Sequence, residues 1–353
     1  MDTTPKVKRE SKNKIRVDFE RAPLLERLKA KFFSVNFLKK VVYVIFRFVL
    51  LLGITYVILF PYIAKIFNSF MTLSDFKDVT VMLISKNPTI DQYKYIILEN
   101  DYFSSLLNTF LLSASTALIQ TVVCALIAYG LAKFKFRGNN IVFAIVVVTL
   151  MVPLEPITYA LQTHFWFFEN SNILGGIVAP IMNALFPPEK GVWQGFINSY
   201  VPMYVMSFTG LGFRNGLFIF MLRQFFRGVP DELEESAYVD GSSTFKTFFR
   251  IIIPISIPML VTVFIFSFAW QWTDDYYVTT LFDSLYIYNN GFPNLRQIVE
   301  IPTYFANDAK SMPQYKSAIE GTATILIALP LIIAYVFLQD KIVQGVERSG
   351  IVG

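Results

Sequence analysis

Few residues in this 353-residue chain could carry out catalytic chemistry. The sequence contains one histidine, His164, and one cysteine, Cys124, which lies inside an apolar run. A single cysteine cannot form a disulfide within the chain, and these two residues supply neither a metal-ligand cluster nor a catalytic triad. No G-x-x-x-x-G-K-[ST] phosphate-binding loop occurs anywhere in the sequence. These residue types argue against a metalloenzyme, a hydrolase and a protein that hydrolyses ATP by itself.

The most unusual polar segment is an elbow at about residues 228–250, within an otherwise apolar sequence. Acidic residues follow Pro230, where the positive end of a helix dipole favours them. Gly241 is placed to end this helix in the left-handed conformation after about ten residues, and Ser242 or Ser243 is placed to cap a second helix. We therefore predict two short helices joined at Gly241.

The first of these helices needs a packing partner, because a helix of about ten residues is only marginally stable alone in water. Small and apolar residues lie three or four apart on one side of it. That side fits a groove on another protein, and it fits equally well against the chain's own helices, so the residues leave both explanations open. The side consists of Leu233, Ser236, Ala237 and Asp240.

The composition of the chain indicates a membrane protein. Hydrophobic residues make up 54% of the sequence and charged residues 16%, and the mean hydropathy is +0.49. A helix needs about 20 mainly apolar residues to cross the hydrocarbon core of a bilayer. We predict an all-α protein with six membrane-spanning helices, the second of which carries a face of small residues suited to close packing. The predicted spans are 41–67, 104–131, 141–160, 197–222, 250–272 and 318–338.

Lysine and arginine residues predict the orientation of these spans. Twelve of them precede residue 41, and others flank the connection after the second span and the elbow. Short basic connections lie on the cytoplasmic side of a membrane. Both termini and the elbow are therefore predicted to be cytoplasmic, and the long segment 161–196 external. The net charge of +5 does not indicate a nucleic-acid partner, because most of the excess lies in the first 47 residues.

The chain divides by composition into three regions. Residues 1–40 form a basic cytoplasmic tail, in which Phe19–Lys40 has the pattern of a helix lying on the inner leaflet or against a partner subunit. Residues 41–340 form the membrane domain, including the elbow. Residues 341–353 form a charged cytoplasmic tail.

The elbow resembles the Glu-Ala-Ala loop of permease subunits in binding-protein-dependent ABC importers. In that loop the Glu-Ala-Ala triplet is followed, at fixed spacings, by a glycine and by Ile-x-Leu-Pro. Every spacing is kept here, with Ser in place of Ala at one position and Ile in place of Leu at another. The matching residues are Glu235-Ser236-Ala237, Gly241 and Ile251-Ile252-Ile253-Pro254.

The resemblance extends over about residues 41–353 and is strongest from residue 214 onward. The approach to the elbow, the Trp-x-Trp-x-Asp end of the fifth span and the glycine-rich C-terminus are similar to the second permease subunit of maltose-type carbohydrate importers. This resemblance implies the type I ABC importer permease fold and the bacterial cytoplasmic membrane. Segment 161–196 is longer than the corresponding link in that family.

The resemblance also implies how such a chain works. The elbow would be a coupling helix that docks on a cytoplasmic ATPase, so that ATP-driven closure of two ATPase subunits switches the permease pair between inward-open and outward-open states. ATP and Mg²⁺ would be held by the ATPase, and this chain would need no cofactor. A second, related permease in a heterodimer and an extracytoplasmic sugar-binding protein would be further partners. The coupling residues would be Leu233, Glu235, Ser236, Ala237, Asp240 and Gly241.

Four residues are candidates for the translocation path of a sugar. Arg214 is predicted near the bilayer midplane, where an arginine must avoid lipid. It either pairs with Asn215 or an acid of the partner permease, or it meets a sugar hydroxyl or carboxylate. Trp270 and Trp272 at the end of the fifth span are either interfacial anchors or a surface on which sugar rings stack.

Two other classes of protein fit the sequence less well. A secondary transporter usually carries ionisable residues inside its spans as ion or proton relays, and here they are few. A polytopic membrane enzyme would need a catalytic constellation that the single His and Cys do not provide. Dependence of activity on an added ATPase subunit would separate both from an ABC permease.

Overall fold

A computed structural model of the chain describes residues 35–151, 159–164, 200–212, 214–281 and 295–350. Regular secondary structure within these ranges is helical, without strands, as predicted for an all-α protein. The chain divides into two compact units, residues 1–64 and 65–353, which we describe separately.

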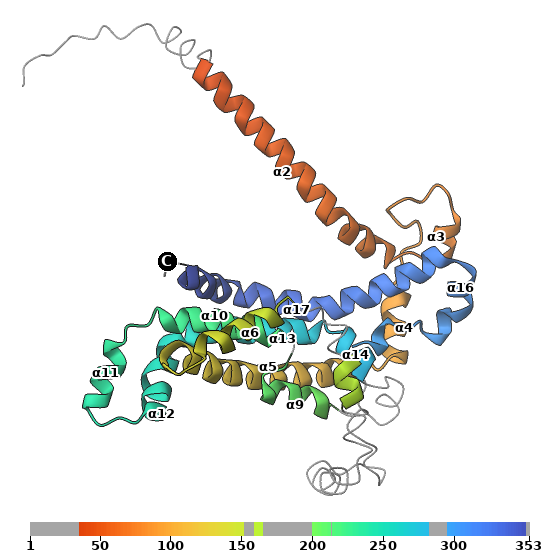
Figure 1. The fold of residues 1–353 in the computed structure, drawn as a ribbon. Helices are drawn as coiled ribbons and strands as arrows, with labels where there is room; N and C mark the ends of the chain where they lie inside the picture. Colours follow the sequence, from red (N-terminus) through yellow and green to blue (C-terminus); the bar gives the residue numbers. More distant parts are fainter. Residues whose placement is uncertain (1–34, 152–158, 165–199, 213, 282–294, 351–353) are drawn as a thin grey trace, which may run out of the picture. The chain divides into compact units, whose positions relative to one another are not determined.

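The first unit consists, in its described part, of the helix α2 (Val35–Asn68), whose last residues pass into the second unit (Figure 1). This apolar helix is 34 residues long and includes Pro61. It begins before residue 41, so the end of the predicted basic tail is helical and continuous with the first span. The rest of the predicted interfacial helix, Phe19–Lys40, lies outside the described residues.

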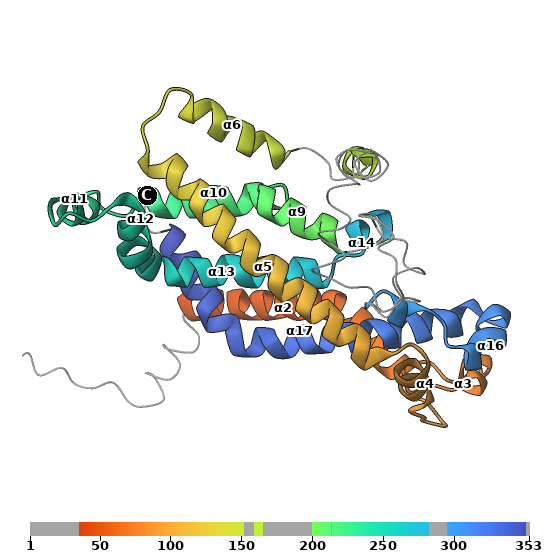
Figure 2. The ribbon, with the colours of Figure 1, turned by 90° about the horizontal axis from the view of Figure 1, so that it is seen from below.

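Helix α5 is at the centre of the helix bundle in the second unit. It packs against α9, α10 and α13, and α13 packs against α17. Figures 1 and 2 show α5, α10, α13 and α17 lying side by side. The bounds are α5 (Tyr102–Lys133), α9 (Val201–Thr209), α10 (Asn215–Arg227), α13 (Ile253–Trp272) and α17 (Pro313–Gly350).

The small residues of α5 let neighbouring helices approach closely. Ser113, Ala117, Thr121, Ala125 and Ala128 are all buried, which confirms the predicted packing face. Large apolar side chains from the other helices fill the space around it and complete the core. They include Phe218, Leu222 and Phe226 from α10 and Met259 and Val263 from α13.

A second close approach joins α6 (Asn139–Thr149) to α10 at Gly216. A Cβ atom on Gly216 would lie 2.5 Å from Thr149 Oγ1 and 3.2 Å from the carbonyl oxygen of Val146. Only glycine fits between these helices at their present separation.

The two ends of the second unit carry different structures. The elbow helices α11 (Glu232–Val239) and α12 (Thr244–Thr247) lie at one end, and short helices lie at the other (Figures 1 and 2). The helices at that other end are α3 (Leu73–Lys77), α4 (Asp91–Glu99), η2 (Gln297–Val299), η3 (Thr303–Phe305) and α16 (Ala306–Ser311).

Hydrogen bonds between distant parts of the sequence connect these end helices. The Asn100 amide donates to the carbonyl oxygens of Ile298 and Glu300 at 3.1 and 2.7 Å. The backbone N–H and the hydroxyl of Thr303 both donate to Glu99, each at 2.6 Å. Segments about 200 residues apart in the sequence are thus joined into one cap, residues 69–101 with 295–315.

The prediction of six spans is only partly matched by the described residues. Four helices are long and apolar enough to cross a membrane, and they correspond to the first, second, fifth and sixth predicted spans. The third predicted span contains α6, which has 11 residues and is followed by residues outside the description. The fourth predicted span, 197–222, is not one continuous helix, because α9 and α10 are separate helices.

The break between α9 and α10 has a clear backbone cause. Gly210 ends α9 with a φ of 76°, and Arg214 precedes α10 with a φ of 60°. Two left-handed residues within one segment cannot continue a right-handed helix.

The predicted C-terminal tail, residues 341–353, is helical in its described part. Helix α17 continues from the sixth span to Gly350, so no change of secondary structure marks residue 341.

Candidate functional site

The elbow has the two-helix structure that its sequence predicts. Helix α11 ends at Gly241, which has a φ of 77°. The N–H of Ser242 donates to the carbonyl of Ala237 at 2.9 Å, and the N–H of Gly241 donates to Tyr238 at 3.0 Å. These two bonds form the Schellman cap that a left-handed glycine allows. The hydroxyl of Ser243 then accepts from the N–H of Lys246 and caps α12.

The predicted coupling residues do not all lie on one accessible face. Ala237 is 6% exposed and therefore buried within the chain. Leu233, Ser236 and Asp240 are exposed, as are Glu235 and Gly241. One side of α11 is thus buried and the other is exposed, and whether the exposed side binds another protein stays a prediction.

The outward face of α11 is more apolar than the sequence analysis recognised. Val239 at its tip is 88% exposed, and Tyr238 beside it is 40% exposed. Tyr238 is hydrogen-bonded to Tyr129 of α5, so we define Leu233, Ser236, Val239 and Asp240 as the outer face of α11. Val239 does not belong to the set of residues spaced three or four apart around Ala237, so that spacing does not indicate its exposure.

The inward side of α11 is attached to the C-terminal end of α5. The Lys133 ammonium donates to the Val229 carbonyl at 2.6 Å and to Asp231 at 2.5 Å. It also lies 3.6 Å from the Glu234 carboxylate, and the Lys133 and Glu234 side chains are only 6% and 9% exposed. The hydroxyl of Tyr129 donates to the other Glu234 oxygen at 3.3 Å. We call Tyr129, Lys133 and Glu234 the α5–α11 joint.

The charge of Lys133 acts on the first residues of the elbow. Its hydrogen bond and positive charge lower the pKa of the exposed Asp231 carboxyl. The sequence analysis counted Lys133 only as an orientation signal. Its partners follow it by about a hundred residues, so no local spacing pattern could reveal them.

The candidate path residues separate into two groups. The Arg214 guanidinium lies over the Trp270 ring, 5.0 Å from its centroid, and Trp270 stacks on Phe218 at 5.5 Å. Asn215 is 2% exposed, and its side-chain amide has no hydrogen-bond partner among the described residues. Trp272 is 5% exposed and donates its indole N–H to the Ile327 carbonyl. Arg214 and Trp270 thus come together, whereas Trp272 is part of the packing between α13 and α17.

A buried polar layer crosses the bundle beside this arginine. Gln120 of α5 accepts from the Ser267 hydroxyl at 2.5 Å and donates to the Ser207 hydroxyl at 3.2 Å. Ser267 belongs to α13 and Ser207 to α9. Gly212 lies against this amide, because a Cβ there would be 2.7 Å from Gln120 Nε2. One α5 side chain therefore joins three helices at this level.

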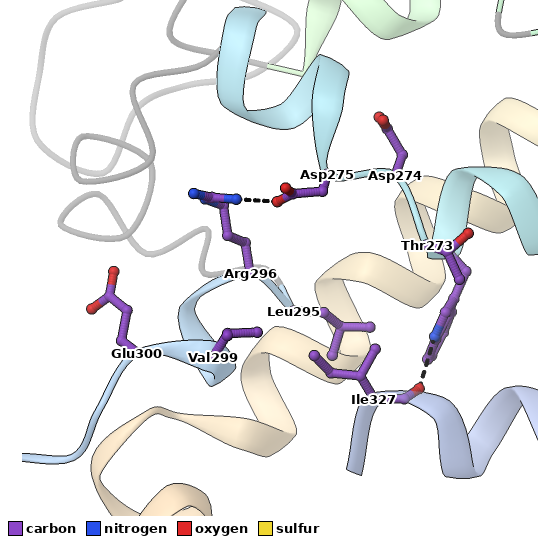
Figure 3. Close-up of a pocket in the computed structure, with 9 residues that line it drawn as sticks. Thr273, Asp274, Asp275, Leu295, Arg296, Val299, Glu300 and Ile327 are labelled. Atoms are coloured by element: carbon purple, nitrogen blue, oxygen red, sulfur yellow. Dashed lines mark hydrogen bonds and ion pairs between the residues drawn. The ribbon is translucent and has the colours of Figure 1, made fainter. Parts of the chain in front are cut away.

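A cavity of about 390 Å³ lies at the other end of the bundle, next to the cap (Figure 3). Leu295, Val299 and Ile327 are among its apolar lining residues, and Arg296 forms an ion pair with Asp275 across it. Its polar residues also include Thr273, Asp274 and Glu300. Burial raises the pKa of Asp274 to about 6, and hydrogen bonds from the backbone of Tyr277 and Tyr276 and from Gln271 partly oppose that shift.

The long segment 161–196 lies mostly outside the described residues. Its described part is helical, and Gln162 donates to the Thr280 carbonyl at 2.7 Å. The segment thereby touches α14 (Tyr276–Leu281), which follows the fifth span.

Among the described residues, four helices are long and apolar enough to cross a membrane, and a polar elbow lies at one end of the bundle of the second unit. Residues 120–348 match the family described as the binding-protein-dependent transport system inner membrane component. The match covers well over half of the sequence, so the chain belongs to this family. The predicted resemblance to ABC importer permeases is confirmed, and the protein is a multi-pass membrane protein.

Curated relatives and a solved structure agree with this assignment. The polygalacturonan/rhamnogalacturonan transport system permease protein YtcP of Bacillus subtilis (strain 168) is 23% identical over 317 residues, 88% of this chain and 97% of that protein. The maltodextrin transport system permease protein MalD of Streptococcus pneumoniae (strain ATCC BAA-255 / R6) is 26% identical over 308 residues, 85% and 92% of the two chains.

The solved structure is a bacterial ABC transporter involved in the import of the acidic polysaccharide alginate. One of its chains superposes with a TM-score of 0.58 at 17% identity, over 86% of this chain and 97% of that one. At this identity the likeness concerns the fold.

Proposed function

We propose that this chain is a permease subunit of an ATP-driven sugar or oligosaccharide importer, and that it forms half of the translocation path. In this proposal the six predicted segments cross the membrane with both termini in the cytoplasm. The chain couples closure of a partner ATPase to switching between inward-open and outward-open states, and ATP and Mg²⁺ bind on that partner. An extracytoplasmic sugar-binding protein delivers the substrate.

The observation that carries this proposal is the outer face of α11. It presents exposed apolar side chains on a short helix at the end of the bundle, held by a glycine cap and attached to α5 on its other side. An isolated helix of eight residues has little stability of its own, so this rigid mounting suits a helix that is inserted into a groove. Family membership supports the same role for the elbow.

The coupling role predicts that a charge on the outer face of α11 separates the ATPase from the permease. Val239→Asp places a carboxylate at the most exposed apolar position of this helix, and burying that charge in a groove is costly. We expect loss of most ATPase subunit on co-purification from detergent, with normal amounts of the permease in the membrane. Val79→Asp is the matched control, because Val79 is 94% exposed at the opposite end of the unit.

The same co-purification tests the partner permease. We propose a heterodimer with a second, related permease, so co-expression of this chain with the ATPase alone should give no stable complex. Wild-type ATPase retention by Val239→Asp would contradict the coupling role. A stable, ATP-hydrolysing complex built from two copies of this chain would contradict the heterodimer.

We base the proposed class of substrate on the names of the relatives. YtcP and the solved transporter are named for acidic polysaccharides, and MalD for maltodextrin. We infer that this importer also carries fragments of carbohydrate polymers. Arg214 beside Trp270 offers a cation and an aromatic ring on the predicted path, a combination that binds an anionic sugar. We therefore place uronate-containing oligosaccharides among its substrates.

A further inference from the structure

We propose that the α5–α11 joint makes the coupling helix and α5 move as one rigid body during the transport cycle, with Lys133 and Glu234 as the positioning residues. The inference deepens the proposed coupling function and rests on it. It assigns a role to residues outside the Glu-Ala-Ala pattern, since Glu234 precedes that triplet and Lys133 lies on another helix.

The joint combines one buried ammonium with one exposed and one buried carboxylate. Asp231 is 76% exposed and accepts a hydrogen bond from Lys133, whereas the buried Glu234 carboxylate lies 3.6 Å from the ammonium and accepts from the Tyr129 hydroxyl. The Lys133 side chain is 6% exposed, yet its ammonium reaches the Val229 carbonyl, Asp231 and Glu234. Val229 and Asp231 lie just before α11, and Glu234 lies in its first turn. Two hydrogen bonds from this ammonium and one from the Tyr129 hydroxyl connect the start of α11 to the end of α5. A buried charge cannot leave its partners without losing all of this compensation, so the joint resists opening.

Aromatic packing surrounds the charged groups and limits their movement. The Tyr129 ring lies 4.7 Å from that of Phe248 and 5.9 Å from that of Phe226, measured between centroids. Phe226 ends the helix that leads into the elbow, and Phe248 begins the segment that leaves it. The approach to the elbow, α11 itself and the exit from the elbow therefore all contact the last turns of α5.

Helix α5 is itself connected to the rest of the bundle at a second level. Gln120 lies thirteen residues before Lys133, about 20 Å along the helix at 1.5 Å per residue. It is hydrogen-bonded to Ser267 of α13 and Ser207 of α9. A displacement of α11 that moves α5 is thus passed to the helices around the polar layer and Arg214.

The alternative is that Lys133 only stabilises the fold. The two roles differ in what happens to α11 when the ATPase closes. A stabilising role lets α11 shift relative to α5, whereas a rigid joint keeps the distance between them constant in every state.

Spin labels measure this distance directly. The labels are attached to Glu232→Cys on α11 and Leu118→Cys on α5, in a Cys124→Ala background. Both positions are exposed and lie outside the joint. The complete importer is measured without nucleotide and after trapping with ATP and vanadate. With Lys133 intact we expect one narrow distance distribution that is the same in both states.

Removal of the Lys133 charge should allow α11 to move relative to α5. In Lys133→Met we expect retained ATPase subunit, but a second and shifted distance population after trapping, because α11 follows the ATPase without α5. Lys133→Arg keeps a positive charge and should restore the single distance. Lys135→Met is the matched control, two residues away and exposed, and should behave as the parent protein.

Each outcome decides the proposal. A single unchanged distance in Lys133→Met would overturn the joint, as would two populations with Lys133 intact. If the complex with Lys133→Met assembles poorly, Glu234→Gln serves as the second variant, because it removes the opposite charge. The same label distances are measured in it, and the same second population is expected. Failure of the parent complex to retain the ATPase would instead overturn the proposed coupling function, so the two failures are distinguishable.

Discussion

At the scale of single residues, Arg214 has a backbone conformation that is unusual for a residue other than glycine. Arg214 occupies the left-handed region of the backbone, which costs a non-glycine residue about 1–2 kcal/mol. Such outliers persist where the surrounding structure enforces them, often at functional sites. The conformation places a cation at the start of α10 and over Trp270, where the predicted path would pass.

Arg214→Ala tests the role of this cation in substrate selection. If Arg214 binds a sugar carboxylate, cells carrying the variant should lose uptake of oligogalacturonate while keeping uptake of maltotriose. Losing one charge-assisted hydrogen bond is worth about 1.5–3 kcal/mol, or roughly ten- to a hundredfold in affinity. Loss of the assembled complex would indicate a structural pair instead. Unchanged assembly and unchanged uptake of both sugars would contradict both roles.

The raised pKa of Asp274 predicts that the stability of the folded protein depends on pH. Burial raises its pKa to about 6, above the ordinary value of 3.8. The folded protein therefore binds this proton more tightly than the unfolded chain, so the contribution to stability is complete below pH 3.8 and is lost as the pH rises through about 6. At neutral pH the charged carboxylate is a cost to the folded state.

Asp274→Asn should remove this cost. We expect the variant to be more stable than the parent protein at pH 8 by up to about 3 kcal/mol, since one pKa unit corresponds to about 1.4 kcal/mol. The difference should shrink towards pH 5, where the parent carboxyl becomes protonated. Thermal unfolding of the purified protein at the two pH values measures it. Asp275→Asn, which affects an exposed ion pair, should not show this pH dependence, and an equal difference at both pH values would contradict the prediction.

Among the elements, the break between α9 and α10 shows what hydropathy cannot predict. The segment 197–222 has the length and apolar content of one span, so a pattern of hydrophobic residues predicts one helix. The interruption depends on the φ angles of Gly210 and Arg214, which composition does not encode. The elbow was more predictable, because Gly241 and Ser243 act within a few residues of their own positions.

The contact of α6 with α10 gives a prediction at the same scale. Gly216→Ala places a methyl group 2.5 Å from Thr149 Oγ1 and 3.2 Å from the carbonyl oxygen of Val146, so the Thr149 side chain or the helices must shift. We expect a loss of about 1–3 kcal/mol in stability, typical of overpacking. Thermal unfolding in detergent measures it, with Gly53→Ala as the control because no atom lies within 4 Å of the added Cβ. Equal stability of the two variants would show that α6 is not held closely against α10.

At the scale of the whole molecule, the sequence predicted the class and the family more fully than the contacts. The number of apolar residues indicated a membrane protein, and the resemblance of the residues around Glu235 and Gly241 to the Glu-Ala-Ala loop indicated an ABC permease. The α5–α11 joint was not predictable, since Lys133 and Glu234 meet only after the helices between them have packed. Gln120 likewise lay unnoticed within an apolar span until its partners on α9 and α13 were known.

The cap formed by residues 69–101 and 295–315 has a consequence for synthesis of the protein. Asn100 and Glu99 leave the ribosome about 200 residues before the backbone groups that they bind. At about 5–20 residues per second this interval lasts roughly 10–40 s. In the proposed orientation the early half of the cap waits outside the membrane for that time, with its polar and aromatic groups uncovered. Membrane insertion of the last span therefore completes a domain on the far side of the bilayer, and a nascent chain stalled before residue 295 would expose this half to proteases of that compartment.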